Sequence, residues 1–523
     1  MLRLNDVSLP LEHTEDDIRR AALTALRVED SRLRSLRVVR RGVDARGRPP
    51  VFILTLEADV ADEDRVLPSP RAVKVAETPA PVPSPSWKGP RPVVVGTGPA
   101  GLFAGLALAR SGARPILLER GRAMEERIRD VGTFFSTGSL ELESNVQFGE
   151  GGAGTFSDGK LHTRIHDPLS RRVLEEFIAF GAPEDIRIDA KPHAGTDVIR
   201  GVVINMRRAI QELGGEVRFR NRMSDLLLDG GRLAGVRVND SEDIRSPVVL
   251  LALGNAARDT FEMLVQRGVA LVPKPFSVGV RIEHLRPLID RARYGPSAGH
   301  PRLGAADYTM SRRTSGGRGA YTFCMCPGGI VIAGASEPGG VVTNGMSWSA
   351  RDGANSNSAL MVGVDARDFG ADDPLAGIAF QRTLERKAFA AGGGGFRAPV
   401  QTVGDFLAGR PTKTLGDVSP SYHPGVTPAD IRAFLPAFVV DALKEAIPAF
   451  DKPLRGFASP GAVLTGVETR SSSPVRMTRD ERAQTNIPGL YALGEGAGYA
   501  GGIVSSAVDG LRAAEAVLAA GIS

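Results

Sequence analysis

The chain has 523 residues, too many for one simple core, and we expect two or three domains. Its composition, 42% hydrophobic and 24% charged, is typical of a globular protein that buries a large core. The 65 Lys and Arg residues are nearly balanced by 60 Asp and Glu, which leaves a formal net charge of +5. So small an excess indicates a mixed, solvated surface and argues against nucleic acid as a partner.

Two cysteines in the whole chain exclude a disulfide framework and fit a reducing compartment. The first residues, MLRLNDVSLPLEHTEDD, contain acids where a signal peptide has a basic start and an apolar run. No stretch reaches the roughly 18 apolar residues that a membrane span requires. We therefore expect a cytoplasmic protein with no membrane partner, and the oligomeric state stays open.

Residues 1–75 are predicted to form a separate N-terminal α+β accessory domain of βαββ order. Thr14 is a suitable helix cap, and Asp16 and Asp17 suit the first turn of the helix that follows. A polar turn through Gly42 and Gly47 is expected between the last two strands. The expected elements are a strand over 1–9, a helix from about Thr14 to Arg27, and strands over Leu33–Arg40 and Val51–Val60.

A proline-rich linker is predicted over residues 76–90. Six prolines lie from Pro79 to Pro92. Because proline has no N–H group and a fixed φ, this density favours an extended spacer. Beyond it, apolar strands, glycine-rich turns and amphipathic helices alternate, which is typical of an α/β domain.

The strongest motif follows this linker, in RPVVVGTGPAGLFAGLALARSGARPILLERG. Val93–Val95 read as a buried parallel strand. The glycines of G-x-G-x-x-G then permit a tight turn, a close approach to a pyrophosphate, and close helix packing, while the helix N-terminus points at the phosphate. A second strand, Pro115–Leu118, ends at an acid suited to both ribose hydroxyls. The residues assigned to this nucleotide site are Gly96, Gly98, Pro99, Ala100, Gly101, Glu119 and Arg120.

The closing segment, IPGLYALGEGAGYAGGIVSSAVDGLRAAEAVLAAG, decides which dinucleotide binds. Leu490–Leu493 is a predicted strand that delivers an acid to a loop, where it can hydrogen-bond the ribitol of FAD. The helix after the loop can direct its N-terminus at the flavin edge on which negative charge develops during reduction. An NAD enzyme has no need of this second arrangement, so we predict FAD. The residues assigned here are Gly494, Glu495, Gly501, Gly502 and Ile503.

Four segments resemble a known family: VQFGEGGAGTFSDGKL, FCMCPGG, ETRSSSPVRM and GEGAGYAGGI. Over nearly its whole length the chain is similar to the uncharacterised bacterial FAD-dependent dehydrogenases, single-Rossmann FAD-dependent oxidoreductases with an inserted substrate domain. The resemblance implies FAD and a redox role but no particular substrate. Glu495 stands where the family's motif usually has Asp, and Asn255 and Ala256 stand where members usually have His and Ser.

The same resemblance implies further cofactor contacts in the middle of the chain. In related flavoproteins a glycine-rich loop passes along the pyrophosphate and the flavin, which implies this role for Gly152, Ala153 and Gly154. A mobile surface loop is the alternative for this segment. Met223 suits packing near the adenine, and Gly254 ends the strand and turn that return the chain past the cofactor.

The predicted fold class is therefore α/β. It comprises a Rossmann-like FAD-binding domain, an inserted α+β substrate domain and the small N-terminal domain. The expected divisions after the linker are 91–275 for the first part of the FAD-binding domain, 276–455 for the inserted substrate or cap domain, and 456–523 for the closing part of the FAD-binding domain.

Two groups of candidate catalytic residues lie in the inserted and closing segments. Cys324 and Cys326 form C-x-C, without the two- or four-residue gap of familiar redox pairs, and a buried structural pair is the alternative. Glu468 and Arg470, with Arg476 nearby, could bind an anionic substrate or stabilise reduced flavin. A surface salt-bridge cluster is the alternative for these three residues.

Four further residues are ambiguous, and two of them, Arg281 and Lys160, are candidate catalytic residues. Arg281 and Glu283 share one face of a predicted strand, where an ion pair between them is the plain explanation, and His284 suits a structural histidine. Lys160 could reach the flavin or the phosphates, or be an ordinary solvated lysine. The seven histidines are scattered, and we expect no metal site.

The leading functional hypothesis is an FAD-dependent oxidoreductase, a dehydrogenase whose flavin accepts hydride from a small organic substrate and is reoxidised by an electron acceptor. No second dinucleotide fingerprint is found, although transient NAD(P) docking stays open. One alternative is a flavoprotein that modifies RNA, with residues 1–75 docking the RNA through an arginine cluster that lacks interleaved aromatics. Another is a non-catalytic FAD-binding protein.

Overall fold

The computed structural model describes residues 1–66, 72–75, 87–163 and 165–521. Most of the predicted linker, residues 76–86, lies outside the described residues. None of the described helices combines the length and the apolar character that crossing a lipid bilayer demands.

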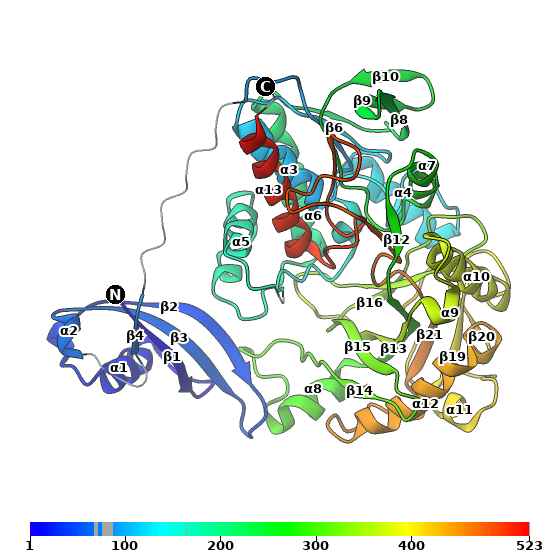
Figure 1. The fold of residues 1–523 in the computed structure, drawn as a ribbon. Coiled ribbons are helices and arrows are strands. Elements are labelled where there is room, and N and C mark those ends of the chain that lie inside the picture. Colours follow the sequence, from blue (N-terminus) through cyan, green and yellow to red (C-terminus); the bar gives the residue numbers. More distant parts are fainter. Residues whose placement is uncertain (67–71, 76–86, 164, 522–523) are drawn as a thin grey trace.

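The N-terminal unit is a four-stranded antiparallel sheet with a helix on one face (Figure 1). The βαββ prediction is confirmed, and the Thr14 hydroxyl and the Asp17 carboxylate form the reciprocal cap of the helix. The turn prediction is wrong at Gly42, which lies inside a strand that runs on to Asp44. The strand order is β2-β3-β1-β4. The elements are β1 Leu2–Leu9, α1 Glu15–Leu26, β2 Leu33–Asp44, β3 Val51–Val60, α2 Glu63–Val66 and β4 Ala72–Lys74.

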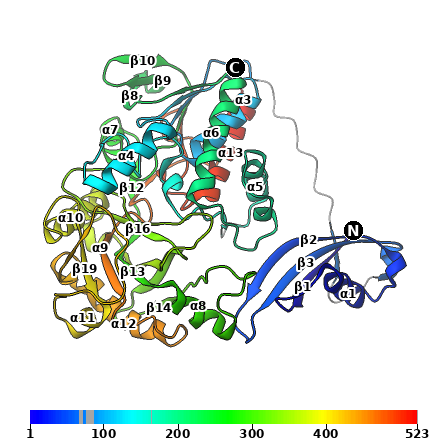
Figure 2. The ribbon, with the colours of Figure 1, turned by 180° about the vertical axis from the view of Figure 1, so that it is seen from behind.

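Arginine side chains join this unit to the body of the molecule, on the side where α8 (Arg286–Tyr294) lies (Figure 2). The Arg41 Nε donates to Asp189 Oδ1 at 3.0 Å. Arg302 donates through Nη1 to the carbonyls of Leu11 at 2.6 Å and His13 at 2.8 Å. Apolar packing adds to these polar contacts, because buried side chains of this unit, such as Leu4 and Phe52, belong to the same hydrophobic cluster as Ile289 and Tyr294.

A five-stranded parallel sheet is the centre of the body, in the order β23-β11-β5-β6-β7. Its strands are β5 Val93–Val95, β6 Ile116–Leu118, β7 Glu216–Arg218, β11 Val249–Leu251 and β23 Leu490–Ala492. Four helices pack together on one side of it (Figure 1): α3 Pro99–Arg110, α5 Leu169–Ala179, α6 Gly195–Glu212 and α13 Ile503–Ala520. The other side carries β8 Met223–Asp229, β9 Arg232–Val238, β10 Glu242–Arg245 and α7 Arg258–Gln266. The predicted Rossmann-like arrangement is confirmed.

A second body is built on a seven-stranded mixed sheet, in the order β14-β15-β18-β13-β21-β19-β20. Its strands are β13 Phe276–Leu285, β14 Ser311–Arg313, β15 Gly319–Cys326, β18 Asn355–Val364, β19 Ala398–Thr402, β20 Val426–Pro428 and β21 Val463–Glu468. Strand β21 comes from the segment expected to close the FAD-binding domain, so the sheet takes in a strand from beyond residue 455. Its helices are α8, α9 Ala366–Phe369, α10 Ala376–Ala391, α11 Val403–Ala408 and α12 Ala437–Asp451.

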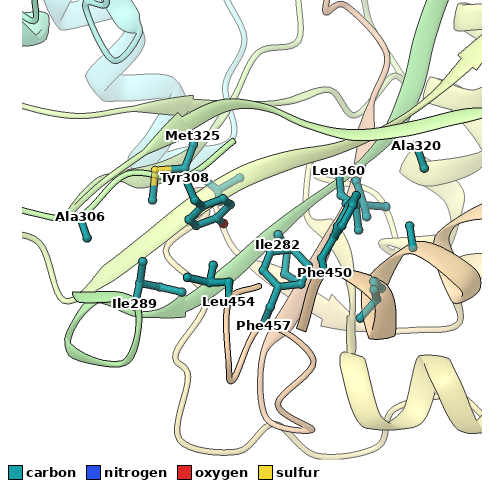
Figure 3. Close-up of a cluster of buried hydrophobic side chains, with 14 of the residues drawn as sticks. Ile282, Ile289, Ala306, Tyr308, Ala320, Met325, Leu360, Phe450, Leu454 and Phe457 are labelled. Carbon is teal, nitrogen blue, oxygen red and sulfur yellow. The ribbon is translucent and has the colours of Figure 1, made fainter. Parts of the chain in front are cut away.

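Aromatic side chains fill the core of this second body (Figure 3). Phe450 of α12 and Phe457 meet edge to face with ring centroids 5.7 Å apart, and both lie close to Ile282 of β13. Tyr308 and Met325 lie beside one another at another edge of the cluster. The remaining elements are α4 Met124–Thr137 and two ribbons, β12 Leu271–Pro273 with β22 Val475–Met477, and β16 Ile330–Ala333 with β17 Thr343–Met346.

Candidate functional site

A cavity of about 690 Å³ lies between the carboxyl ends of the parallel strands and the seven-stranded sheet. Ligands of open α/β sheets bind at this edge, because the turns after the strands and the helix N-termini meet there. Segments far apart in the chain line this one cavity, among them 95–100, 119–120, 147–149, 152–154, 157–160, 252–257, 322–325, 468, 470–471, 493–495 and 498–506.

The first glycine turn forms one wall with almost no side chains. Gly96 has φ +101°, which glycine adopts without strain, and a Cβ on Gly101 would lie 1.9 Å from the Gly96 carbonyl oxygen. Gly98 faces Gly152 of the second glycine-rich segment, so two backbone segments without side chains approach one another beside the N-terminus of α3. The turn therefore offers N–H groups and a helix dipole to a phosphate.

Glu119, at the end of β6, connects the two glycine segments. Its carboxylate accepts hydrogen bonds from the Thr97 N–H at 3.0 Å and hydroxyl at 2.7 Å. It also accepts from the N–H groups of Gly121 at 2.9 Å and Gly149 at 3.0 Å. The predicted ribose ligand thus lies on the cavity, and it also fixes the turn against the glycine loop.

A buried arginine that the sequence reasoning missed holds the glycine loop in shape. Arg127 of α4 is fully buried and donates to the carbonyls of Asn145 at 2.9 Å, Val146 at 3.0 Å, Glu150 at 2.6 Å and Gly152 at 2.9 Å. Burial lowers its pKa to about 9. The carbonyls turn toward this guanidinium, residues 148–151 are buried and 152–154 line the cavity, so the segment is part of the cavity wall and not a surface loop.

The closing loop forms the opposite wall. Glu495 is half-buried and accepts a hydrogen bond from Asn255 Nδ2 at 2.8 Å. Burial raises its pKa to about 7, although the nearby Lys274 opposes this change. The loop is fixed from behind, where Asp509 accepts from the Gly494 N–H at 2.7 Å and pairs with Arg479 at 2.7 Å. Arg479 and Asp509 are further positioning residues that the sequence reasoning missed.

Met223 and Gly254 also lie on the cavity wall, as does Arg120. The Arg120 guanidinium lies 4.0 Å above the Phe148 ring and pairs with Glu143 and Asp259, so it stabilises this part of the cavity wall. The helix α13 begins at Ile503 directly after Gly502, and its first turn faces the cavity. The cavity thereby brings together the residues that the sequence assigned to the cofactor, except Gly101, which lies behind the lining against the Gly96 carbonyl.

The candidate catalytic residues divide into two groups. Lys160, Cys324, Glu468 and Arg470 line the cavity. Arg281 lies behind the wall, fully buried, and does not reach the cavity lining. The structure therefore assigns Arg281 to positioning other side chains rather than to contact with a ligand.

Two of the alternatives weighed for these residues are wrong. Arg281 does not pair with Glu283: it pairs with Glu468, Nε to Oε2 at 2.9 Å, because β13 and β21 are neighbours in the sheet. Glu283 instead accepts from Asn355 Nδ2 at 3.1 Å and from Ser421. The 468–470 group is no surface salt-bridge cluster, since Glu468 and Arg470 are both buried.

The remaining ambiguous residues have structural partners. The His284 Nε2 lies 2.8 Å from the Phe457 carbonyl oxygen inside the core, which fits the structural role. Arg476 lies 5.1 Å from the Tyr499 ring centroid. Lys160 is no solvated lysine: its ammonium lies 3.0 Å from the Asp158 carboxylate and also donates to the Met325 carbonyl.

Comparisons with known proteins identify relatives of the chain. The family model described as "FAD-dependent protein, C-terminal domain-like" matches residues 275–471, and "Domain of unknown function (DUF8436)" matches residues 1–59. An uncharacterized protein of Clostridium beijerinckii is 44% identical over 530 residues, which cover 99% of this chain and 98% of that protein.

The chain belongs to this family of FAD-dependent proteins. Among solved structures, the 3-ketosteroid-delta4-(5alpha)-dehydrogenase of Rhodococcus jostii RHA1 is 13% identical with a TM-score of 0.34, over 83% of this chain and 99% of that one. The quinol fumarate reductase FrdA of E. coli is 14% identical with a TM-score of 0.35, over 84% of this chain and 72% of that one. Likeness at this level carries no argument about activity.

FAD is the cofactor of this FAD-dependent protein, and the cavity fits it. Gly98 and Gly152 have no side chains, so the cavity wall between them forms a cradle, a space that the side chains of other residues would fill. The N-termini of α3 and α13 both face the cavity. The cradle would hold the pyrophosphate, Glu119 the adenosine ribose, and Glu495 with the start of α13 the ribitol and flavin end.

We expect Gly98→Ala to weaken FAD binding without damage to the fold. Gly98 has φ −69°, which alanine adopts freely, and its Cβ would meet only Gly152 Cα at 3.9 Å. The added methyl would occupy the pyrophosphate cradle, so FAD affinity should fall at least about tenfold. Equilibrium dialysis of FAD and thermal unfolding of the apoprotein measure the two effects.

The control is Gly101→Ala, whose Cβ would lie 1.9 Å from the Gly96 carbonyl oxygen. This variant should lose folded protein as well as FAD. A Gly98→Ala protein that keeps FAD at the native affinity would show that the pyrophosphate binds elsewhere.

Proposed function

We propose that the protein is an FAD-dependent oxidoreductase, a dehydrogenase that uses bound FAD to take hydride from a small organic substrate. One observation carries the proposal: the cavity that cradles the nucleotide continues to a wall of charged and thiol side chains from the second body. FAD when bound supplies the two-electron chemistry, and the protein must supply orientation, electrostatics and proton control.

Lys160 is the residue we assign to binding and orienting a negatively charged or polar group of the substrate. Although burial opposes it, the Asp158 carboxylate raises the pKa of Lys160, so the ammonium is charged at neutral pH. Asp158 is itself held by Arg351 at 2.7 Å, which fixes the position of the ammonium on the wall. A fixed charge of this kind favours the anionic form of a neighbouring group.

Glu468 is the residue we assign to holding a proton at this wall. Burial raises its pKa, while Arg281 opposes the change. Its Oε2 also accepts from the Thr343 hydroxyl at 3.3 Å. Arg470 has a different role, because its guanidinium is engaged by Glu385 at 2.9 Å and by Ser336 Oγ at 2.5 Å. It supports the wall rather than the substrate.

No specific observation favours an RNA-modifying function. The arginine cluster of the N-terminal unit is largely paired with carboxylates, which removes much of its attraction for phosphates. The pairs are Arg32–Asp62, Arg34–Asp59, Arg37–Glu57, Arg41–Asp189 and Arg46–Asp44. For the electron acceptor we propose a separate molecule, NAD(P) among the candidates, that docks transiently at the cavity mouth.

An anaerobic assay tests the function. The yellow FAD-loaded protein is mixed with a panel of alcohols, amines and hydroxy acids, and bleaching of the flavin absorbance is followed. We expect bleaching by one class, and at least a tenfold slower rate in Lys160→Met, since the fixed ammonium is lost. If photoreduced flavin passes no electrons to any acceptor, the protein is a non-catalytic FAD-binding protein.

A further inference from the structure

The two cysteines lie at an irregular end of β15, on the cavity wall. The pairing of β15 with β18 shifts register between Phe323 and Cys326, and Cys324 has φ +43°. This kink turns the half-buried Cys324 toward the cavity, while Cys326 stays fully buried behind it. Met325 between them packs into the core beside Tyr308 (Figure 3). Strain at an irregular strand end beside a cavity is typical of functional positions.

The two cysteines are in contact. The Cys326 thiol donates to the Cys324 carbonyl oxygen, with Sγ 3.2 Å from that oxygen. Arg281 reaches the pair from behind, with Nη1 3.0 Å from the Cys324 carbonyl oxygen and 3.8 Å from Cys326 Sγ. The buried arginine thus braces a pair of sulfurs within reach of one another.

Positive charge surrounds the pair from several elements. The Lys160 ammonium donates to the carbonyl of Met325, between the two cysteines. The hydrogen bond from Cys326, and then the charges of Lys160 and Arg281, lower the pKa of Cys324, while burial and the charged neighbour raise that of Cys326. The ionisable side chains facing the pair are Lys160, Arg281, Asp158, Tyr308, Glu468 and Glu495.

We propose that Cys324 and Cys326 form a dithiol in the cofactor cavity that reacts with small disulfides, with Cys324 as the attacking thiolate and Cys326 as the resolving thiol. A thiolate at Cys324 offsets the cations around it, whereas Cys326 has no exposed surface and can react only with its neighbour. This activity does not depend on hydride chemistry at the flavin, and so goes beyond the oxidoreductase function.

The exchange balances without any further reagent. The Cys324 thiolate attacks one sulfur of the small disulfide, and the other sulfur leaves as a thiolate with the electron pair of the broken S–S bond. Cys326 then gives its proton to that thiolate and attacks the Cys324 sulfur, which expels the second small thiolate. The Cys324–Cys326 disulfide forms, the cysteines are oxidised, and the small disulfide is reduced.

Alkylation of the full-length FAD-loaded protein by iodoacetamide tests the thiolate. Mass spectrometry of the peptide containing both cysteines should show Cys324 modified at a rate that is half-maximal well below pH 8.5, the pKa of an ordinary thiol. Lys160→Met should raise this midpoint by about one pH unit. The control Lys191→Met removes an exposed lysine paired with Asp307 and should leave the midpoint unchanged.

Glutathione disulfide tests the exchange. The native protein should lose two hydrogens from the peptide and gain no glutathione, while Cys326→Ser should retain one glutathione at Cys324 and Cys324→Ser should retain none. Flavin absorbance and circular dichroism verify that the two serine variants are folded. A midpoint near pH 8.5, or no glutathione adduct on Cys326→Ser, would overturn the proposal and leave the proposed oxidoreductase function untouched.

Discussion

Replacement of Arg127 by Met is expected to give a protein that is purified without FAD. The native guanidinium donates to five backbone carbonyls of the glycine loop and to the Thr155 hydroxyl at 2.8 Å. Met fills the space but donates nothing, and each buried carbonyl left without a donor costs about 1–3 kcal/mol. The loop should therefore adopt other conformations, and the Gly98–Gly152 cradle should open.

The loss of two such hydrogen bonds corresponds to a decrease of at least about a hundredfold in FAD affinity. Titration of the apoprotein with FAD, followed by flavin fluorescence, measures the change. Arg127→Lys should recover little, because an ammonium cannot supply the fork of donors that several carbonyls share.

Arg200→Met is the matched control. Arg200 lies 4.4 Å from the centroid of the same Phe156 ring that Arg127 contacts at 4.8 Å, but it donates only to the Thr155 carbonyl, at 3.3 Å. Its loss should weaken FAD binding far less than the loss of Arg127. Equal effects of the two substitutions would mean that the stacking on Phe156 orders the loop, and that the hydrogen bonds from Arg127 to the backbone carbonyls do not.

The nucleotide site was predictable because its signals are local. The strand Val93–Val95, the glycine turn and the helix from Pro99 follow one another directly, so the sequence states both the elements and their order. The same holds for the closing strand Leu490–Ala492, its loop and the helix that begins at Ile503. What a turn requires of its own residues can be read without knowledge of the rest of the fold.

The partners of the buried charges could not be predicted, since they depend on the order of strands in a sheet. Arg281 and Glu283 alternate on one strand, which made them plausible partners, yet the neighbouring strand β21 brings Glu468 to Arg281 from 187 positions away. Arg127 did leave a signal: it falls in the buried stripe of α4 with Met124, Val131 and Phe134, where an apolar residue is expected. A buried charge in such a stripe needs several hydrogen-bond acceptors around it.

Glu385→Gln is expected to cost about 3–5 kcal/mol in the free energy of unfolding, the usual cost of breaking a buried ion pair. Glu385 of α10 is fully buried and pairs with two buried arginines, Arg258 of α7 at 2.7 Å and Arg470 at 2.9 Å. It therefore ties the second body to the FAD-binding domain. Glutamine preserves the shape but leaves the two cations without their shared carboxylate.

The pH dependence gives this prediction a second readout. Although burial opposes it, Arg470 and Arg258 hold the pKa of Glu385 well below its usual value of 4.5. A carboxyl whose pKa is depressed by folding stabilises the protein above its unfolded pKa, and this contribution declines as the pH falls toward the folded pKa. The difference in the free energy of unfolding between the native protein and the variant should be largest at neutral pH and should decrease below about pH 4.5.

Urea unfolding monitored by circular dichroism, at neutral pH and at pH steps below it, measures both effects. Glu337→Gln is the control: Glu337 contacts Arg258 at 2.7 Å, but its side chain is 27% exposed and water can replace the lost interaction. Its loss should cost about 1 kcal/mol or less. If Glu385→Gln cost no more than Glu337→Gln, the two bodies would be joined by their apolar contacts, and Arg470 would be available to bind an anionic substrate after all.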